Sequence, residues 1–423
     1  MKKLLVSIEK NGRQTRVGTI EGSGIHDAVF CYDRAWLDTD GAIPVSLSLP
    51  LREEAFSPEE TRNYFEGLLP EGFTKRSVAK WMQADENDYL TILSGLGQEC
   101  LGAIQVMAEG VKSPEARYVR MTEQQMQEFA AEGAVKSAEI VTALHLSLTG
   151  ASGKTGLYLD DNSRLWYFPE GTAPSTHIVK QSHVRLKNMV TNEQLCLATA
   201  KNLGLSVPAS FAIKTADENP LFATPRYDRV ISDKSKVIDG LPGPFRLHQE
   251  DLAQALGITA ENKYETVPLN YTAKVCGLLR DFSSDPIRDI LQFWNITIFN
   301  YLIGNTDGHL KNFSLLYDKN LLNLHLAPAY DIVSTAVYPG HTRNMSMYIG
   351  DKNNMDQIRR SDFIDGADRS GIRSAVIMRQ FDTLAGHFEE AINKAADDLQ
   401  QDGYENAGTV RDKILQNAGY KNL

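Results

Sequence analysis

Cysteine is scarce in this chain, and the residues present are widely scattered. They are Cys31, Cys100, Cys196 and Cys276, and no two of them form a Cys-x-x-Cys pair. A structural zinc site or a disulfide framework needs cysteines at close, paired spacings. The sequence therefore predicts neither, and it favours a reduced, cytoplasmic protein.

Long apolar runs are also lacking. No stretch of about 18 uninterrupted apolar residues exists, so no transmembrane helix is expected. The opening residues Met1 to Leu5 have the look of a signal peptide, but Glu9 and Lys10 end the apolar run too early for export. The longest candidate, residues 287–303, is interrupted by polar side chains and is interpreted as a buried or amphipathic helix. We expect no membrane association.

An excess of basic residues is the third absence. The 44 Lys and Arg residues are outnumbered by 54 Asp and Glu residues, which gives a formal net charge of -10. A protein that grips nucleic acid by itself needs a basic surface to neutralise the phosphates. We therefore expect any association with DNA to be indirect.

The chain has the composition of an ordinary globular protein, 42% hydrophobic and 23% charged, and its 423 residues predict two or three domains. A polar stretch over 107–136 is the best candidate boundary, giving an N-terminal subdomain (1–136) and a second domain (137–423). The second starts with strands, in a β-rich lobe at about 137–229, and then turns helical, at about 230–423. This order predicts an α+β class: a two-lobed, protein-kinase-like fold with an additional β-rich N-terminal subdomain.

Individual elements are predicted from periodicity and from turn residues. The expected strands are residues 4–8, 16–20, 28–32, 143–148, 156–159, 165–168, 176–180, 210–214, 221–227, 313–317 and 321–326, the last two as a hairpin. Helices are expected over 57–79 with a break at 69–72, over 192–203, 250–256 and from Pro286, and through most of the last fifty residues. Thr191 is the expected N-cap of the second helix and Gly204 its terminator.

The most informative motif is the loop Gly304-Asn305-Thr306-Asp307-Gly308-His309-Leu310-Lys311-Asn312-Phe313, followed by Tyr330-Asp331. Phosphoryl transfer uses one carboxylate to orient the attacking hydroxyl, and an Asn with a second Asp to hold Mg²⁺. Asp307, Asn312 and Asp331 have the required types and spacing. Asp and Asn are also common in loops for turn reasons alone, so this pattern needs support from the rest of the chain.

A glycine-containing turn precedes this loop: Ser147-Leu148-Thr149-Gly150-Ala151-Ser152-Gly153-Lys154-Thr155. A Walker A motif fits poorly, because Leu148 stands where a glycine is required and a strand is expected where a helix is required, so a P-loop NTPase is the least favoured function. Backbone N–H groups at Gly150 and Gly153 could cover phosphates. The alternative is an ordinary polar hairpin turn.

Lys180 ends a predicted strand, and Glu193 lies on the next predicted helix. They match the lysine that contacts nucleotide phosphates and the glutamate that pairs with it in phosphoryl-transfer enzymes. A solvated lysine at a strand edge is the alternative. The order of glycine-rich turn, strand lysine, helix glutamate and Asp…Asn…Asp favours the functional interpretation.

Two further positions have open interpretations. Thr224, Pro225 and Arg226 lie where a hinge that contacts adenine would fall, although the alternating charges of residues 226–229 are typical of a surface strand. Lys311 is either a neutraliser of charge on the transferred phosphoryl group or an exposed loop lysine.

Several blocks, in order, resemble the HipA-like serine/threonine kinases of bacterial toxin–antitoxin modules. They are Phe65 to Gly72, Cys100 to Ala103, Ser147 to Thr155, His177 to Lys180, Asn192-Glu193, Arg226 to Arg229, His248 to Asp251, Gln254 to Gly257, Asn305 to Phe313 and Tyr330-Asp331. The resemblance covers most of the chain.

The resemblance implies a kinase that uses ATP and Mg²⁺. Asp307 would be the catalytic aspartate, Asn312 and Asp331 the Mg²⁺ ligands, and Lys180 the residue that holds the α- and β-phosphates. Residues 147–154 would form the phosphate loop. The family implies inhibitory autophosphorylation of the serine that opens this loop, here Ser147, although Ser152 offers a competing hydroxyl.

The same resemblance implies a growth-arresting toxin whose protein substrate is a translation component such as an aminoacyl-tRNA synthetase. It also implies a helix-turn-helix, HipB-like antitoxin, through which the protein would reach DNA indirectly. A kinase-shaped binding module that acts mainly as a co-repressor with the antitoxin is the alternative function.

Overall fold

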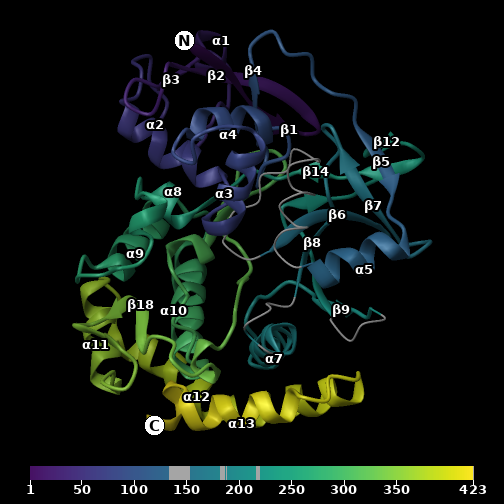
Figure 1. The fold of residues 1–423 in the computed structure, drawn as a ribbon. Coiled ribbons are helices and arrows are strands. Elements are labelled where there is room, and N and C mark those ends of the chain that lie inside the picture. The colour runs from purple at the N-terminus through teal and green to yellow at the C-terminus, as the bar shows by residue number, and fades with distance from the viewer. Residues whose placement is uncertain (133–152, 182–185, 187, 216–219, 423) are drawn as a thin grey trace. The chain divides into compact units, whose positions relative to one another are not determined.

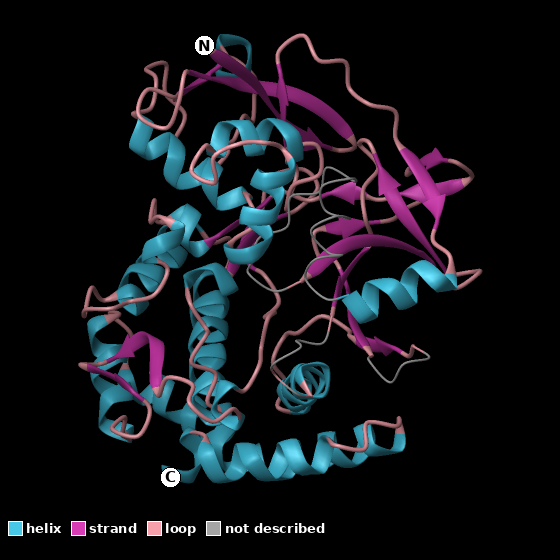
Figure 2. Cartoon of the chain, in the orientation of Figure 1, coloured by secondary structure: helices cyan, strands magenta, loops and turns pink. Residues whose placement is uncertain are grey.

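The computed structural model describes residues 1–132, 153–181, 186, 188–215 and 220–422 (Figure 1). The chain forms two compact units. The first contains residues 1–184, 211–260 and 316–323, and the second contains residues 185–210, 261–315 and 324–423. Helices and strands are both abundant (Figure 2). None of the described helices is long and apolar enough to cross a membrane.

The first unit begins with a four-stranded antiparallel sheet in the order β3-β2-β1-β4. Its strands are β1 (Lys2–Lys10), β2 (Arg13–Gly22), β3 (Val29–Tyr32) and β4 (Ile104–Ala108). The helices of this region are α1 (Arg34–Leu37), α2 (Pro58–Phe65), η1 (Glu66–Leu68), α3 (Gly72–Trp81) and α4 (Tyr89–Leu96). The three expected strands and the broken helix are confirmed. Ser57 and Glu60 form a capping box that starts α2.

A six-stranded sheet follows, in the order β5-β7-β6-β8-β10-β9. Its strands are β5 (Arg117–Arg120), β6 (Lys154–Asp160), β7 (Leu165–Glu170), β8 (His177–Lys180), β9 (Phe211–Ile213) and β10 (Leu221–Pro225). Helix α5 (Glu123–Glu132) contributes Phe129 to a core with Leu157 and Val179 of the sheet. Strand β5 pairs with β7 although it precedes residue 136. The expected domain boundary at 136 lies outside the described residues and stays a prediction, as does the strand at 143–148.

Smaller elements complete the first unit. They are β11 (Arg229–Val230), β12 (Lys236–Ile238), β13 (Leu241–Gly243), β14 (Phe245–Arg246), β15 (Gln249–Asp251) and α8 (Leu252–Ala255). Asp251 and Gln254 form the capping box of α8.

A buried cluster of charges crosses the interior of the first unit. Glu99 accepts hydrogen bonds from Arg226 (3.2 Å), Arg229 (2.8 Å) and Arg246 (2.8 Å). Asp228 pairs with Arg226 and Arg229, and Glu9 pairs with Arg246. Burial by itself would raise the pKa of Glu99, but the three arginines outweigh it and lower that pKa to about 2. The interpretation of residues 226–229 as a surface strand is therefore wrong.

The second unit is mainly helical. Its helices are α7 (Met189–Asn202), η2 (Ala260–Asn262), α9 (Tyr271–Phe282), α10 (Pro286–Ile303), η3 (Leu310–Asn312), η4 (Thr335–Val337), α11 (Arg360–Arg369), α12 (Ser374–Gln401), α13 (Ala407–Asn417) and η5 (Gly419–Asn422). The strands are β17 (Leu324–Leu326), β18 (Asn344–Ile349) and β19 (Lys352–Asn354). Strand β16 (Ser314–Tyr317) starts in this unit, and its residues 316–317 are counted with the first.

Helix α10 supports the loop that the sequence singles out. Pro286 occupies its first turn, as expected, and the Asp285 side chain caps it. Gly304 ends it with φ +67°, and a Cβ there would lie 2.6 Å from Cβ of Ala336, so both conformation and space require glycine. The hairpin of β16 and β17 is confirmed by the bond from Ala327 N to Ser314 O (2.8 Å), but β17 begins at Leu324 and not at the expected residue 321.

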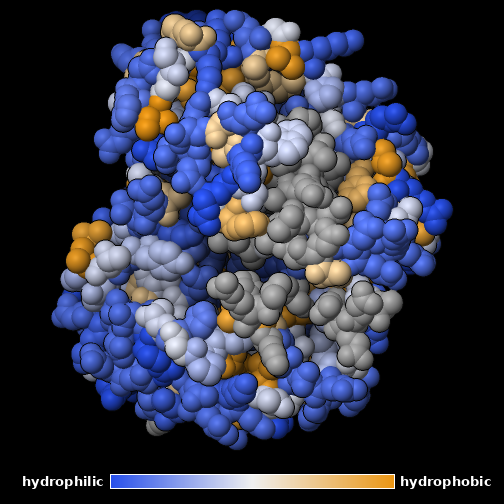
Figure 3. All heavy atoms as spheres, in the orientation of Figure 1, coloured by the Kyte–Doolittle hydropathy of each residue, from blue (hydrophilic) through white to orange (hydrophobic). Residues whose placement is uncertain are grey.

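Two local expectations are corrected. Helix α7 begins three residues earlier than expected, with Asn188 at the N-cap in place of Thr191, whereas Gly204 follows its end with φ +79° as expected. The stretch from 107 to 136 contains β5 and α5 as well as a loop. On the face in Figure 3, hydrophobic residues are scattered among hydrophilic ones.

Candidate functional site

The loop after α10 is built by the asparagines around it. Asn305 donates from Nδ2 to Oδ1 of Asn300 (3.0 Å), and its own Oδ1 accepts the backbone N–H of Asp307 (3.0 Å). Asn312 then donates from Nδ2 to the carbonyl of Asp307 (2.8 Å), which closes the loop. Both ends of the predicted Asp-x-x-x-x-Asn motif are thereby held together.

Thr335 and Tyr330 fasten the segment around Asp331 to this loop. The Thr335 hydroxyl accepts the N–H of Thr306 (2.9 Å) and donates to the carbonyl of Gly304 (2.9 Å). Tyr330 donates to the carbonyl of Lys311 (2.9 Å). Asp331 itself has φ +53°, a left-handed conformation that non-glycine residues seldom adopt and that is often found at functional sites.

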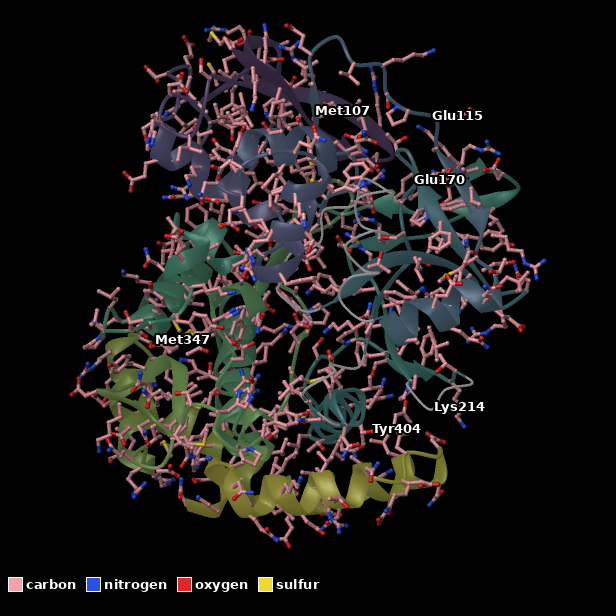
Figure 4. The ribbon with its side chains drawn as sticks, in the orientation of Figure 1. Met107, Glu115, Glu170, Lys214, Met347 and Tyr404 are labelled. Atoms are coloured by element: carbon pink, nitrogen blue, oxygen red, sulfur yellow. The ribbon has the colours of Figure 1, made fainter. Side chains whose placement is uncertain are left out.

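The segment before α9, residues 263–265, is also hydrogen-bonded to this loop, directly and through Ser346. Lys263 accepts the N–H of Leu310 at its carbonyl (3.4 Å), and Glu265 donates its N–H to the carbonyl of Ser346 (2.8 Å). Ser346 in turn donates from its hydroxyl to the carbonyl of Thr306 (2.6 Å). Ser346 precedes Met347, which Figure 4 labels on β18.

Tyr264, in the same segment, donates its hydroxyl to Oδ1 of Asp307. Its ring packs edge-on against the buried imidazole of His309, with centroids 4.8 Å apart. Burial, assisted by the charges of Lys263 and Lys311, lowers the pKa of His309 to about 3. The imidazole is therefore neutral at physiological pH and serves as a packing partner in this loop.

The predicted site residues divide between the two compact units. Glu193, Asp307, Lys311, Asn312 and Asp331 belong to the second unit. The first unit contains Gly153, Lys154, Lys180, Thr224, Pro225 and Arg226. The predicted ion pair of Lys180 with Glu193 stays a prediction. Ser147, Thr149, Gly150, Ala151 and Ser152 lie outside the described residues.

Lys180 lies on a central strand, so the alternative of a solvated edge lysine is wrong. It pairs directly with Lys154 of β6 on one side and with Phe222 of β10 on the other. Only 9% of Lys180 is exposed, and its Nζ lies 5.1 Å from the centroid of the Phe222 ring. Directly opposed residues of an antiparallel pair share one face of the sheet, so two cationic side chains start from neighbouring positions.

The remaining predicted residues have definite surroundings. Lys311 is buried, so the alternative of an exposed loop lysine is wrong. Glu193 is buried on α7. Thr224 and Pro225 pair with β8, and the N–H of Arg226 donates to the carbonyl of Thr176 (2.8 Å). The Arg226 side chain binds Glu99 and Asp228 in the buried charged cluster.

The sequence interpretation gives no role to three residues that shape the site: Tyr264, Thr335 and Asn192. Asn192 belongs to one of the blocks that resemble the HipA-like kinases, but no function is assigned to it. Nothing in the local sequence pattern distinguishes Tyr264 or Thr335. Their partners lie 43, 29 and 142 residues away in sequence, so only folding brings them together.

The donor set suits a magnesium ion. Asn312 commits its Nδ2 to the Asp307 carbonyl, so its oxygen is the remaining polar atom of the amide, and Asp331 adds a carboxylate. Carboxylate and amide oxygens are the ligand types that Mg²⁺ prefers. Among the described residues, no group of three or more His, Cys, Asp and Glu side chains forms a metal-binding cluster. A two-residue oxygen set is the kind that binds Mg²⁺ together with substrate phosphates.

Known proteins are similar to this chain over most of its length. Residues 146–399 match the HipA-like C-terminal domain, and residues 11–107 match the HipA N-terminal domain. The Y4mE protein of Sinorhizobium fredii, whose name gives it as a candidate kinase, is 32% identical over 382 residues, covering 88% of this chain and 87% of that protein. The serine/threonine-protein kinase toxin HipA of Shewanella oneidensis is 25% identical, covering 85% and 82%.

A solved structure has the same fold. It is the Shewanella oneidensis toxin–antitoxin complex of HipA, HipB and operator DNA, in which one chain matches with a TM-score of 0.79 at 20% identity, over 99% of this chain and 97% of that one. The expected α+β, protein-kinase-like fold class is confirmed. Because the C-terminal domain match alone spans more than half of the sequence, this chain belongs to the HipA family.

Proposed function

We propose that this protein is an ATP- and Mg²⁺-dependent serine/threonine protein kinase. The observation that carries the proposal is the fastening of the Asp307–Asn312 loop to the segment around Asp331, through Thr335 and Tyr330. Phosphoryl transfer depends almost entirely on such positioning of a few charged groups. The kinase name of a relative that is 25% identical supports the same activity.

In this proposal each group has one task. Asp307 accepts a hydrogen bond from the attacking hydroxyl and orients it, as the exposed Tyr264 hydroxyl is oriented in this structure. Asn312 and Asp331 hold Mg²⁺, which when bound neutralises charge on the nucleotide phosphates. Lys180 and its cross-strand neighbour Lys154 contact phosphates. Lys311 contributes positive charge beside the loop.

The other nucleotide contacts are proposed from their place in the chain. Thr224 to Arg226 would border the adenine, and Glu193 would pair with Lys180. The phosphate loop, 147–154, would cover the phosphates through its glycines. Phosphate on Ser147, or on Ser152 as the competing acceptor, adds close to two negative charges and would oppose ATP binding.

We propose that the kinase acts as the toxin of a type II toxin–antitoxin system. The likeness to a chain solved with HipB and operator DNA supports a helix-turn-helix antitoxin as its partner, with DNA reached through that partner. A translation component such as an aminoacyl-tRNA synthetase is the proposed protein substrate. Phosphorylation of a synthetase near its ATP site would block tRNA charging and slow growth.

The test is transfer of labelled γ-phosphate to protein by wild type, Asp307→Asn and Asp331→Ala, in cells without antitoxin and with purified protein. Asp351→Asn is the matched control, because Asp351 is an exposed carboxylate whose ion pair with Arg369 lies on the surface of the same unit. We expect the first two variants to lose transfer and the control to keep it. Undiminished transfer by Asp307→Asn would refute the assignment.

Phosphoproteomics of the same cultures identifies the substrate, and mass spectrometry of the purified protein tests Ser147 and Ser152. A co-repressor role is the second candidate function, favoured by the likeness to the complex on operator DNA. It predicts antitoxin binding that survives Asp307→Asn, with no ATP turnover in any form of the protein.

A further inference from the structure

Helix α7 and the segment that follows Asp331 are joined by one buried side chain, Asn192. Its Nδ2 donates to the carbonyl of Ser334 (2.8 Å), and its Oδ1 accepts the N–H of the same residue (3.1 Å). The Nδ2 also lies 3.3 Å from the hydroxyl of Tyr338. Asn192 and Ser334 are both fully buried. The amide thus engages both backbone groups of one residue, Ser334, as a residue on a neighbouring antiparallel strand would.

Only an amide of this length can make both bonds. An aspartate offers two acceptors and would face the Ser334 carbonyl with negative charge, whereas an apolar side chain leaves both backbone groups without a partner. Since the peptide groups are buried, water offers no easy replacement. The choice of asparagine is therefore tied to the backbone at Ser334, three residues after Asp331.

Further contacts along the helix hold the same segment. The N–H of Ala329 donates to the carbonyl of Ser206, just beyond the C-terminus of α7 (2.9 Å). At the other end the Tyr338 hydroxyl contacts the sulfur of Met189, in the first turn of α7 (3.8 Å). Residues 329–338 are therefore attached to α7 near both ends and at Asn192.

The same segment is attached to the Asp307–Asn312 loop through Thr335 and Tyr330. Asp331, at φ +53°, lies between these attachments. A left-handed backbone at a non-glycine residue persists where its surroundings determine it. The surroundings here are the loop on one side and, through Asn192, the helix that carries Glu193 on the other.

We infer that Asn192 is a positioning residue for metal binding: it transmits the placement of α7 to the backbone that presents Asp331. The inference deepens the proposed function and rests on it for the identity of the metal. Asn192 itself contacts neither metal nor substrate in this role. It acts by fixing the backbone N–H and C=O of Ser334, so that a shift of α7 at Asn192 moves the Mg²⁺ ligand.

Asn192→Asp is the sharpest variant, because it keeps the size of the side chain and removes one hydrogen-bond donor. Asn202 provides a matched control: it is an amide of the same helix that also donates to a backbone carbonyl, that of Ala391 on α12 (3.1 Å). Asn202→Asp makes the same amide-to-carboxylate change on α7 and leaves the contacts of residues 329–338 in place.

Two measurements on the full-length protein decide the inference. The first is the Mg²⁺ concentration for half-maximal binding of a non-hydrolysable ATP analogue. We expect it to rise about tenfold or more in Asn192→Asp, as is typical when a group that orients a metal ligand is lost. It should be unchanged in Asn202→Asp. Equal shifts in both variants, or no shift in folded Asn192→Asp, would overturn the inference.

The second measurement is hydrogen exchange at the Ser334 amide in the wild type, which needs neither a variant nor catalysis. We expect this amide to exchange together with the amides of α7. If the Ser334 amide instead exchanges at the rate of the amides in the Asp307–Asn312 loop, independently of α7, the coupling is contradicted. This outcome can be read even if a variant fails to fold. A wild type that binds no ATP analogue would refute the proposed function, while hydrogen exchange still tests the coupling.

Discussion

The charged cluster around Glu99 and the loop around Asp307 use acidic residues in opposite ways. In the first unit Glu99 and Asp228 are buried, and each is paired with arginines. In the second unit Asp307 is exposed, and the loop is shaped by neutral amides, hydroxyls and backbone groups. Charged groups pair with one another inside the first region, whereas the hydrogen bonds that shape the Asp307–Asn312 loop come mainly from neutral groups.

Glu99→Gln gives the largest expected change in stability. It removes one charge and leaves three buried arginines with less compensation, so we expect a loss of roughly 3–5 kcal/mol in the free energy of unfolding of the first unit. Urea unfolding measures this loss. Glu109→Gln is the control, because Glu109 is an exposed partner of Lys3 in the same unit. A loss below about 1 kcal/mol would show that the cluster is dispensable for stability.

Asp331→Asn should have the opposite effect to Glu99→Gln: a small loss of stability and a large loss of activity. Asparagine tolerates the left-handed conformation, so the fold should lose less than about 0.5 kcal/mol. Phosphate transfer should fall ~10²–10³-fold, equivalent to about 3–4 kcal/mol of barrier, because a charged metal ligand is lost. Kinetics and urea unfolding of the same preparation measure both effects. A large loss of stability would place Asp331 with the structural charges.

Local pattern was enough to predict the loop after α10, because Asp307, Asn312 and Asp331 are specified by spacing along the chain. It was also enough for most elements with clear periodicity, such as α12, whose regularly spaced apolar residues (Ile377, Phe381, Leu384, Phe388 and Ile392) are buried. The resemblance to the HipA family and the fold class are confirmed by the comparisons, whereas the roles of the site residues stay proposals.

Patterns failed where the partner lies far away in sequence. Arg226 and Arg229 are typical of a surface strand until Glu99, 127 and 130 residues earlier, is brought to them. Strand β5 has a single buried side chain, and its partner β7 follows an intervening helix. Neither Tyr264 nor Asn192 carries a local signal of its contact with the loop or with Ser334.

Glu250 extends the comparison within the first unit, because this buried carboxyl is contacted by a hydroxyl and a backbone N–H rather than by arginines. Ser46 and the N–H of Leu47 donate hydrogen bonds to it, yet burial raises its pKa from 4.5 to about 8. Between these values the folded protein retains a proton that the unfolded chain releases. Stability should therefore fall as pH rises through this window, by up to about 1.4 kcal/mol per pH unit.

Glu250→Gln removes this ionisation. Its advantage over wild type in unfolding free energy should grow steadily from pH 5 to pH 8 and then level off. Glu99 has the opposite sign: its pKa of about 2 means that its contribution is complete above pH 4.5 and is lost as pH falls towards 2. Urea unfolding at four pH values tests both. A pH-independent difference between Glu250→Gln and wild type would show that Glu250 is charged in the folded protein.

The smallest effect is expected at an ion pair that the fold neither buries nor uses. Lys394 and Asp398 lie one turn apart on α12, with side chains 62% and 55% exposed. Solvent screens such a pair, and Lys preceding an acidic residue is the weaker orientation on a helix. A double-mutant cycle with alanine at both positions should give a coupling of about 0.2–0.5 kcal/mol. A coupling near that of the Glu99 cluster would mean that pairing by itself, without burial, makes a charge structural.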